Sequence, residues 1–252
     1  HPMEHLSRLI ADRGWKDACI GLEMDNYWFS AKAHTTLLKA FKPNNLQDAT
    51  GLVNWQRSVK SDLEIGFIRR AAKIVDAMHA RVFELVEPGL PKNVLVAEIQ
   101  KQSILGADGN WGDYAAFVPM APSGMDATAP HLTWDDRPFK KGEGTFFELG
   151  GCYRRYHAPL SRTVYLGKPP QKFLDAEKAV LDATSAGLEL AKPGKTCGDV
   201  ADAFFDELKR HGFAKDSRAG YSIGLSYPPD WGERTMSIRR GDSTELEPNM
   251  TL

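Results

Sequence analysis

The sequence contains little cysteine and no long apolar run, and these absences exclude several classes of protein. Three cysteines occur among 252 residues, at Cys19, Cys152 and Cys197, with no CxxC pair. Such a set does not predict a disulfide framework or a cysteine zinc site, so a reducing, cytoplasmic compartment is expected. No apolar stretch approaches the roughly 18 residues that a membrane span needs, so no membrane segment is expected.

An excess of charge of one sign is also missing. The 32 Lys and Arg residues nearly balance the 33 Asp and Glu residues, and no basic run occurs. Nucleic-acid or anionic-membrane binding would need such a basic feature, so a small molecule is the expected partner. The start at His1-Pro2 resembles neither a signal peptide nor a natural start, and we expect both ends to be cut from a longer protein.

Local patterns divide the chain into a small α/β region at residues 1–54 and a larger region at 55–252. In the first, apolar spacing predicts helices at 3–13 and 28–41 around a strand at 18–22. In the second, Ser61 and Glu64 have the spacing of a capping box at the start of a long helix. Further elements of this region are predicted as strands at 111–118 and 145–166 and helices at 171–191 and 196–211.

A short repeat is the most informative structural signal. Residues 83–89 read FELVEPG, and residues 188–194 read LELAKPG. Each copy ends a predicted helix and is followed by a turn and a further helix. The pattern favours a duplicated α+β unit with pseudo-twofold symmetry, and the alternative is that two unrelated helices share a Pro-Gly stop.

Several segments together resemble the creatinase/aminopeptidase, or pita-bread, family. These segments are residues 57–71, 142–150, 161–163, 220–225 and 246–250. The resemblance covers residue 55 to the end and implies an α+β pita-bread catalytic domain, truncated at its C-terminal end, after the remnant of a small N-terminal domain. It also implies a homodimer.

The metal-ligand positions of this family are altered here. Metal-dependent members hold two cations with two Asp, one His and two Glu, which suits hard divalent ions. The resemblance places Glu148 at the first Asp position, Pro159 at the second and Tyr221 at the His position. The two Glu positions fall beyond Leu252. Proline has no side-chain donor, so no metal and no other cofactor are expected.

The altered residues at the metal-ligand positions resemble those of two metal-free branches of the family, the creatinases and the ectoine hydrolases. His131 falls at the position of the creatinase histidine base. Residues 131–138, 155–163 and 224–235 resemble ectoine hydrolases more than creatinases. This resemblance implies a metal-independent hydrolase that opens the cyclic amidine ring of ectoine to N-acetyl-L-2,4-diaminobutyrate.

The resemblance assigns roles to four residues. His131 is the expected base and then acid, because an ordinary histidine titrates near pH 6.5. Glu148 is expected to pair with the amidinium or to attack it directly. Tyr221 is expected to donate a hydrogen bond to the substrate, and Glu233 to hold a ring nitrogen or orient water. Their structural alternatives are a turn cap for His131, plain packing for Tyr221 and a solvated loop charge for Glu233.

Other functions stay open at this point. A creatinase-like amidinohydrolase would use the same histidine base without a metal. An Xaa-Pro dipeptidase needs a metal ligand at the position of Pro159, which argues against that activity. A non-catalytic binding module is the third alternative. His157, close to the altered ligand position, is expected to make a structural polar contact. Trp231 is expected either to line the pocket or to pack its loop.

Overall fold

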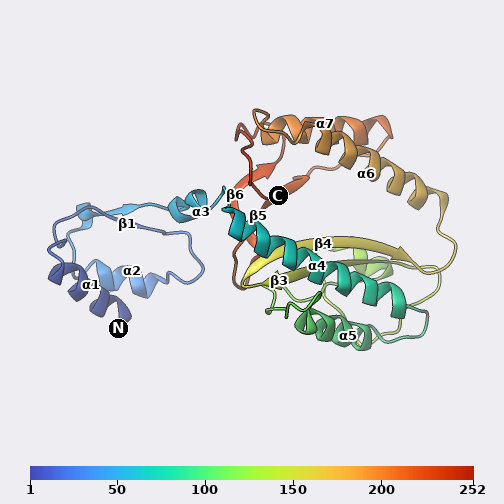
Figure 1. The fold of residues 1–252 in the computed structure, drawn as a ribbon, viewed down its shortest axis with the longest axis horizontal. Helices are drawn as coiled ribbons and strands as arrows, with labels where there is room; N and C mark the ends of the chain where they lie inside the picture. The colour runs from blue at the N-terminus through green and yellow to red at the C-terminus, as the bar shows by residue number, and fades with distance from the viewer. The chain divides into compact units, whose positions relative to one another are not determined.

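The computed structural model describes residues 1–252, which form two compact units (Figure 1). Unit 1 comprises His1–Arg57 and unit 2 comprises Ser58–Leu252. The predicted boundary after residue 54 falls inside a short helix, Leu52–Gln56, and the structure places the division after that helix. No helix in either unit is both long enough and apolar enough to span a membrane.

Unit 1 is a small α/β unit, as the periodicity predicts. Its elements are α1 (Pro2–Asp12), β1 (Ile20–Leu22), α2 (Ala31–Leu37), η1 (Pro43–Asn45), β2 (Leu46–Asp48) and α3 (Leu52–Gln56). Strands β1 and β2 pair in parallel. Helix α2 begins later than predicted because the Ser30 side chain accepts the amide of Ala33 and so fixes the start of the helix.

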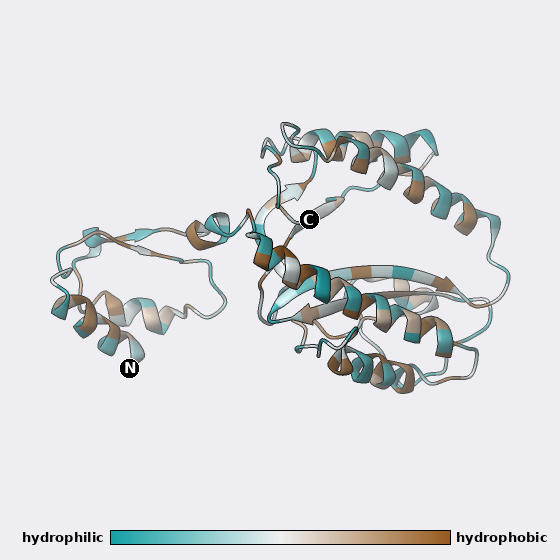
Figure 2. Ribbon diagram, in the orientation of Figure 1, coloured by the Kyte–Doolittle hydropathy of each residue, from teal (hydrophilic) through white to brown (hydrophobic).

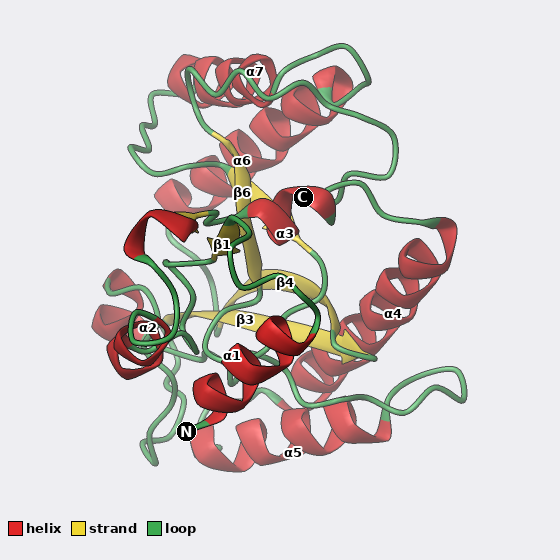
Figure 3. Cartoon of the chain, turned by 90° about the vertical axis from the view of Figure 1, so that its left-hand side faces the viewer, coloured by secondary structure: helices red, strands yellow, loops and turns green.

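Unit 2 contains the larger set of helices and strands (Figure 3). These elements are α4 (Asp62–Leu85), α5 (Lys92–Leu105), η2 (Gly124–Thr128), β3 (Gly144–Tyr153), β4 (Tyr156–Tyr165), α6 (Gln171–Leu190), α7 (Cys197–Arg210), β5 (Gly220–Ile223) and β6 (Gly232–Ile238). The capping box predicted at Ser61 and Glu64 is present and starts α4. The three cysteines are all unpaired.

The antiparallel β3–β4 hairpin forms the centre of unit 2. One face of the hairpin packs on α4, with Phe147 and Leu149 fully buried. Each such side chain contributes roughly 1.5–3 kcal/mol when it leaves water. Figure 2 shows apolar and polar residues alternating around α4, as a helix with one buried face requires. The same cluster includes the α4 and α5 residues Ala71, Ile74, Val75, Met78, Val82, Leu95, Val96 and Ile99.

The strand predicted at residues 111–118 is wrong. The segment contains no strand and bends at residues 116–117, and its backbone donors bind scattered acceptors. The Asp113 amide donates to the Cys152 carbonyl at 2.8 Å, and the Ala116 amide donates to Nε2 of His157 at 2.9 Å. Aromatic and β-branched residues favour extended backbone, but they do not show whether a neighbouring strand is available for pairing.

Both copies of the repeat end a long helix that a shorter helix follows, as predicted. The turn glycines Gly89 and Gly194 have φ angles of 97° and 82°, in the left-handed region that glycine adopts at no steric cost. The first copy connects α4 to α5, and the second connects α6 to α7. The two helix pairs therefore have the same local construction.

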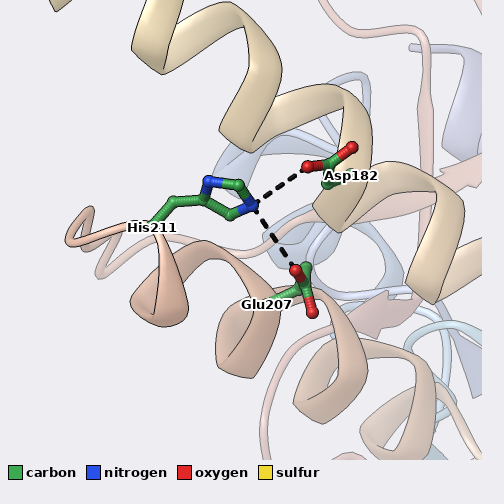
Figure 4. A group of neighbouring side chains, drawn as sticks. All are labelled: Asp182, Glu207 and His211. Atoms are coloured by element: carbon green, nitrogen blue, oxygen red, sulfur yellow. Dashed lines mark ion pairs between the residues drawn. The ribbon is translucent and has the colours of Figure 1, made fainter.

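Helices α6 and α7 lie side by side and share a charged contact. Nε2 of His211 lies 3.0 Å from Oδ2 of Asp182 and 3.4 Å from Oε1 of Glu207 (Figure 4). The donor types suit a metal ion. Each carboxylate, however, also pairs with a cation of its own helix, Lys178 for Asp182 and Arg210 for Glu207. Each carboxylate is therefore balanced by a cation of its own helix, and the His211 ring connects the two carboxylates across the helices.

Candidate active site

The candidate active site lies on the face of the hairpin that points away from α4. Residues directly opposite in an antiparallel pair share a face, and successive residues alternate. Glu148 pairs with Ser161, and Gly150 pairs with Pro159. Because Phe147 and Leu149 face α4, these four residues face the other way. Pro159 is thus a diagonal neighbour of Glu148, where the resemblance places the second metal ligand.

Glu148 is a half-buried carboxylate at the middle of β3. Its backbone exchanges two hydrogen bonds with Met120, of 3.1 and 3.2 Å, which fix the strand on its second edge. Its side chain makes no ion pair or hydrogen bond with another residue. Burial raises the pKa of Glu148, and the nearby charge of His131 acts in the opposite direction. An unpaired carboxylate in such a place is costly for the fold, which is typical of a functional residue.

His131 lies on an exposed turn close to Glu148. Its φ of 65° is in the left-handed region, which a non-glycine residue occupies only when the surrounding structure holds it there. The His131 ring centroid lies 5.9 Å from that of Phe117. Phe117 in turn contacts Trp231, whose ring packs on Gly150, two residues along β3 from Glu148. The two predicted catalytic side chains are thus attached to one aromatic cluster, while their roles stay predictions.

Tyr221 and Trp231 form an aromatic wall with Phe117. The indole Nε1 of Trp231 donates to the Tyr221 hydroxyl at 2.7 Å, and Trp231 meets Phe117 edge-on at 4.8 Å between centroids. Burial raises the pKa of Tyr221, so the phenol stays protonated and can donate its own hydrogen. Trp231 is 2% exposed.

Gly150 makes room for this wall. A Cβ atom at Gly150 would lie 2.7 Å from the Trp231 ring, closer than real carbon contacts allow. A glycine inside a predicted strand is a known sign of such close approach, and the Gly150-Gly151 pair did carry this signal in the sequence. Phe117 carried no comparable signal, because an aromatic residue in an extended segment is more often part of the core.

Glu233 is buried in β6 and forms an ion pair with Lys60. The Lys60 Nζ atom lies 2.5 Å from Oε2 of Glu233, with side chains 1% and 2% exposed. Lys60 also donates to the Ser58 carbonyl at 3.0 Å. A Cβ atom at Gly224 would lie 2.0 Å from the Glu233 carboxylate, so glycine is needed there. The alternative of a solvated loop charge is therefore wrong, while the predicted substrate contact stays a prediction.

Arg155 connects the two loops that carry the aromatic wall. Its guanidinium donates to the Tyr114 carbonyl and, at 2.9 Å, to the Ser226 carbonyl. The guanidinium lies 3.9 Å from the ring centroid of Tyr114 and 4.6 Å from that of Tyr227. Neither a loop arginine nor its two tyrosines could be assigned this role from the sequence.

His157 makes the structural contact expected of it. The ring is fully buried, and its Nε2 accepts the amide of Ala116 at 2.9 Å. Burial lowers the pKa of His157 to about 4, so the ring is neutral at physiological pH. It therefore acts as a fixed acceptor beneath the segment that leads to Phe117.

A pocket of about 450 Å³ opens along the same hairpin face, next to the site. Its lining residues are Gly124, Met125, Ala127, Thr128, Gly142, Glu143, Gly144, Phe146, Thr163, Tyr165 and Phe173. Glu148 and Tyr221 do not line it. Phe146, which packs against the aromatic wall, is shared by both. Pocket and candidate site are therefore neighbours along one face of the hairpin.

Comparison with known proteins identifies the family. Residues 66–252, well over half of the chain, match metallopeptidase family M24. The chain belongs to this family. It is 54% identical over its full length to the ectoine hydrolase of Halomonas elongata and spans 65% of that protein. The chain thus corresponds to less than two thirds of this relative.

Solved structures confirm the predicted pita-bread fold of this M24 chain. An Xaa-Pro dipeptidase from Bacillus anthracis superposes with a TM-score of 0.83 at 22% identity, covering 98% of this chain and 66% of that one. The N-terminal domain of the FACT complex subunit SPT16 from Cicer arietinum superposes with a TM-score of 0.78 at 17% identity, covering 99% of this chain and 62% of that one. At these identities the likeness concerns the fold alone.

M24 is a metallopeptidase family, and the three ligand positions that the resemblance assigns within this chain do not fit a pair of divalent cations. Pro159 has no donor atom on the face it shares with Glu148. Tyr221 keeps its proton, and its oxygen already accepts the Trp231 indole. Glu148 is then the one anionic oxygen ligand among the three positions, and two hard divalent cations need several.

Proposed function

We propose that this M24 chain belongs to a hydrolase that opens the cyclic amidine ring of ectoine to N-acetyl-L-2,4-diaminobutyrate without a metal. The observation that carries the proposal is the 54% identity to the Halomonas elongata ectoine hydrolase along the whole chain. The site supports it independently, because the altered ligand positions leave a carboxylate, a histidine and a phenol around an aromatic wall.

The unpaired carboxylate suits a cationic, planar substrate. Ectoine carries a positive amidinium ring, and Glu148 is the half-buried anion beside the aromatic wall. An amidinium that approaches Glu148 supplies the missing counter-charge and lowers the pKa of the carboxyl. Aromatic faces also attract flat cations, by about 0.5–2 kcal/mol. The substrate therefore completes a charge pair that the free protein lacks.

His131 and Tyr221 would handle protons and charge during ring opening. His131 takes a proton from the water that adds to the amidine carbon, and it returns that proton to the departing ring nitrogen. The Tyr221 hydroxyl donates a hydrogen bond to the tetrahedral centre. In the second route, a Glu148 oxygen bonds to the amidine carbon, and protonated His131 gives its proton to the ring nitrogen as the ring C–N bond breaks. Water then adds to the same carbon and returns a proton to His131, and the bond to the Glu148 oxygen breaks to release the carboxylate.

Glu233 has two candidate roles. The predicted contact with a ring nitrogen would need the carboxylate to serve both the substrate and Lys60. The buried pair alone anchors the start of β6 next to Trp231 and so supports the aromatic wall. We propose the anchoring role as sufficient, and the double substitution described in the Discussion separates the two.

The first test is turnover by the chelator-treated full-length protein. Ectoine, creatine and a Gly-Pro dipeptide are offered in parallel, and release of N-acetyl-diaminobutyrate is followed. We expect turnover of ectoine alone, insensitive to chelation, lost in Glu148→Ala and retained in Glu177→Ala, a change of an exposed glutamate on α6.

Other outcomes point to other functions. Turnover of creatine would indicate a creatinase-like amidinohydrolase, and dipeptide cleavage only after manganese addition would refute the metal-free proposal. No turnover by folded protein would favour a binding module. The homodimer is a prediction that light scattering of the full-length protein tests. The cytoplasmic location, expected from the scattered cysteines, also stays a prediction.

A further inference from the structure

The proposed substrate has a second charge that the site residues described above do not address. Ectoine is a zwitterion, with a carboxylate on the ring carbon next to one amidine nitrogen. Glu148 and His131 account for the amidine end. A site that selects this zwitterion over other amidines needs a cation for the carboxylate, placed a few ångströms from Glu148.

Arg218 is an arginine beside the site with no acidic partner. It is exposed on the loop before β5, and its guanidinium lies 4.4 Å from the ring centroid of Tyr221. It makes no ion pair and no hydrogen bond. Tyr221 accepts the indole of Trp231, whose ring packs on Gly150, two residues along β3 from Glu148. Arg218 and Glu148 therefore border the same aromatic cluster.

Two buried cations near the site, Lys60 and Arg155, already have partners. Lys60 is held by Glu233 and by the Ser58 carbonyl. Arg155 is held by the carbonyls of Tyr114 and Ser226. Binding a substrate carboxylate would break these contacts, and each buried partner left unsatisfied costs free energy. Arg218 would break none.

We propose that Arg218 binds the carboxylate of the substrate and thereby sets specificity for a carboxylated cyclic amidine. This inference rests on the proposed function. Stacking on Tyr221 restrains the guanidinium before the substrate arrives, and its planar fork suits two parallel hydrogen bonds to a carboxylate. Arg218 on one side and Glu148 on the other would orient the zwitterion so that its amidine carbon faces His131.

The test compares ectoine with the same ring lacking the carboxylate, 2-methyl-1,4,5,6-tetrahydropyrimidine. In the full-length protein, Arg218→Gln is expected to lower kcat/KM for ectoine about 10- to 100-fold, mostly through KM, as loss of a charge-assisted hydrogen bond predicts. For the ring without a carboxylate, kcat/KM should stay within about twofold of the wild-type value. Arg218→Lys should keep part of the preference for ectoine.

A matched control is Arg69→Gln, which removes an exposed arginine on α4. This variant should leave kcat/KM unchanged for both substrates. Equal losses for both substrates in Arg218→Gln would mean that Arg218 only supports Tyr221, and no loss would also refute carboxylate binding. If the folded wild-type protein turns over neither ring, the proposed function itself fails. Ectoine turnover that does not depend on Arg218 refutes only this inference.

Discussion

Removing one partner of the Lys60–Glu233 pair should destabilise the protein strongly. The two side chains are 1% and 2% exposed and 2.5 Å apart, so neither charge can turn to water when the other is lost. Breaking such a buried pair typically costs about 3–5 kcal/mol. For a protein of this size, 1 kcal/mol corresponds to roughly 2–4 °C in melting temperature. Glu233→Gln should therefore lower Tm by roughly 6–20 °C.

Replacing both partners should restore most of that stability. A buried ion pair changed to apolar residues of similar volume is often neutral or stabilising, because no charge stays without a partner. Lys60→Met combined with Glu233→Met should melt within a few degrees of the wild-type protein. Thermal unfolding followed by circular dichroism compares the wild-type protein, Glu233→Gln, the single variants Lys60→Met and Glu233→Met, and the double variant at one protein concentration.

The activity of the double variant then decides the role of Glu233. If the pair only anchors β6, the stable double variant keeps ectoine turnover within about tenfold of the wild-type rate. If Glu233 also contacts the substrate, the double variant is stable but inactive. A Glu233→Gln protein that melts at the wild-type temperature would contradict the reasoning, because the burial of the pair predicts a large loss.

Three further predictions concern pH and packing. Burial raises the pKa of Glu148 above its ordinary 4.5, so the acid-side decrease of kcat/KM should occur at a pH above 4.5. Glu148→Gln should raise the free energy of unfolding at neutral pH, because the ionised carboxylate opposes folding there. The pKa of His157 is about 4 in the folded protein, so the free energy of unfolding should fall by on the order of 3 kcal/mol as the pH drops from about 6.5 to 4. Urea unfolding should show a smaller decrease for His157→Gln over the same pH range. Gly150→Ala should displace Trp231 and raise KM for ectoine while the protein stays folded. Gly151→Ala should prevent folding, because its Cβ would lie 2.1 Å from a backbone oxygen of α4. Equal thermal stability of the two alanine variants would contradict this difference.

Much of the fold could be predicted from the sequence because its signals are local. The capping box at Ser61 and the Pro-Gly stops at residues 88–89 and 193–194 act within a few residues of themselves, and the structure has helix ends at each of them. The hairpin between residues 144 and 165 was predicted from its aromatic and β-branched content. The substitution of Pro159 at a ligand position could also be recognised from the sequence, because proline has no donor in any fold.

The arrangement of the site depended on contacts between distant segments. Residue spacing does not predict the packing of Trp231 over Gly150, the ion pair of Glu233 with Lys60, or the contact of the Arg218 guanidinium with the Tyr221 ring. These contacts join β3, β5, β6 and the start of unit 2, and they form only when the strands have paired in register. The strand wrongly predicted at residues 111–118 has the same origin, since only the tertiary structure decided that its amides bind His157 and Cys152.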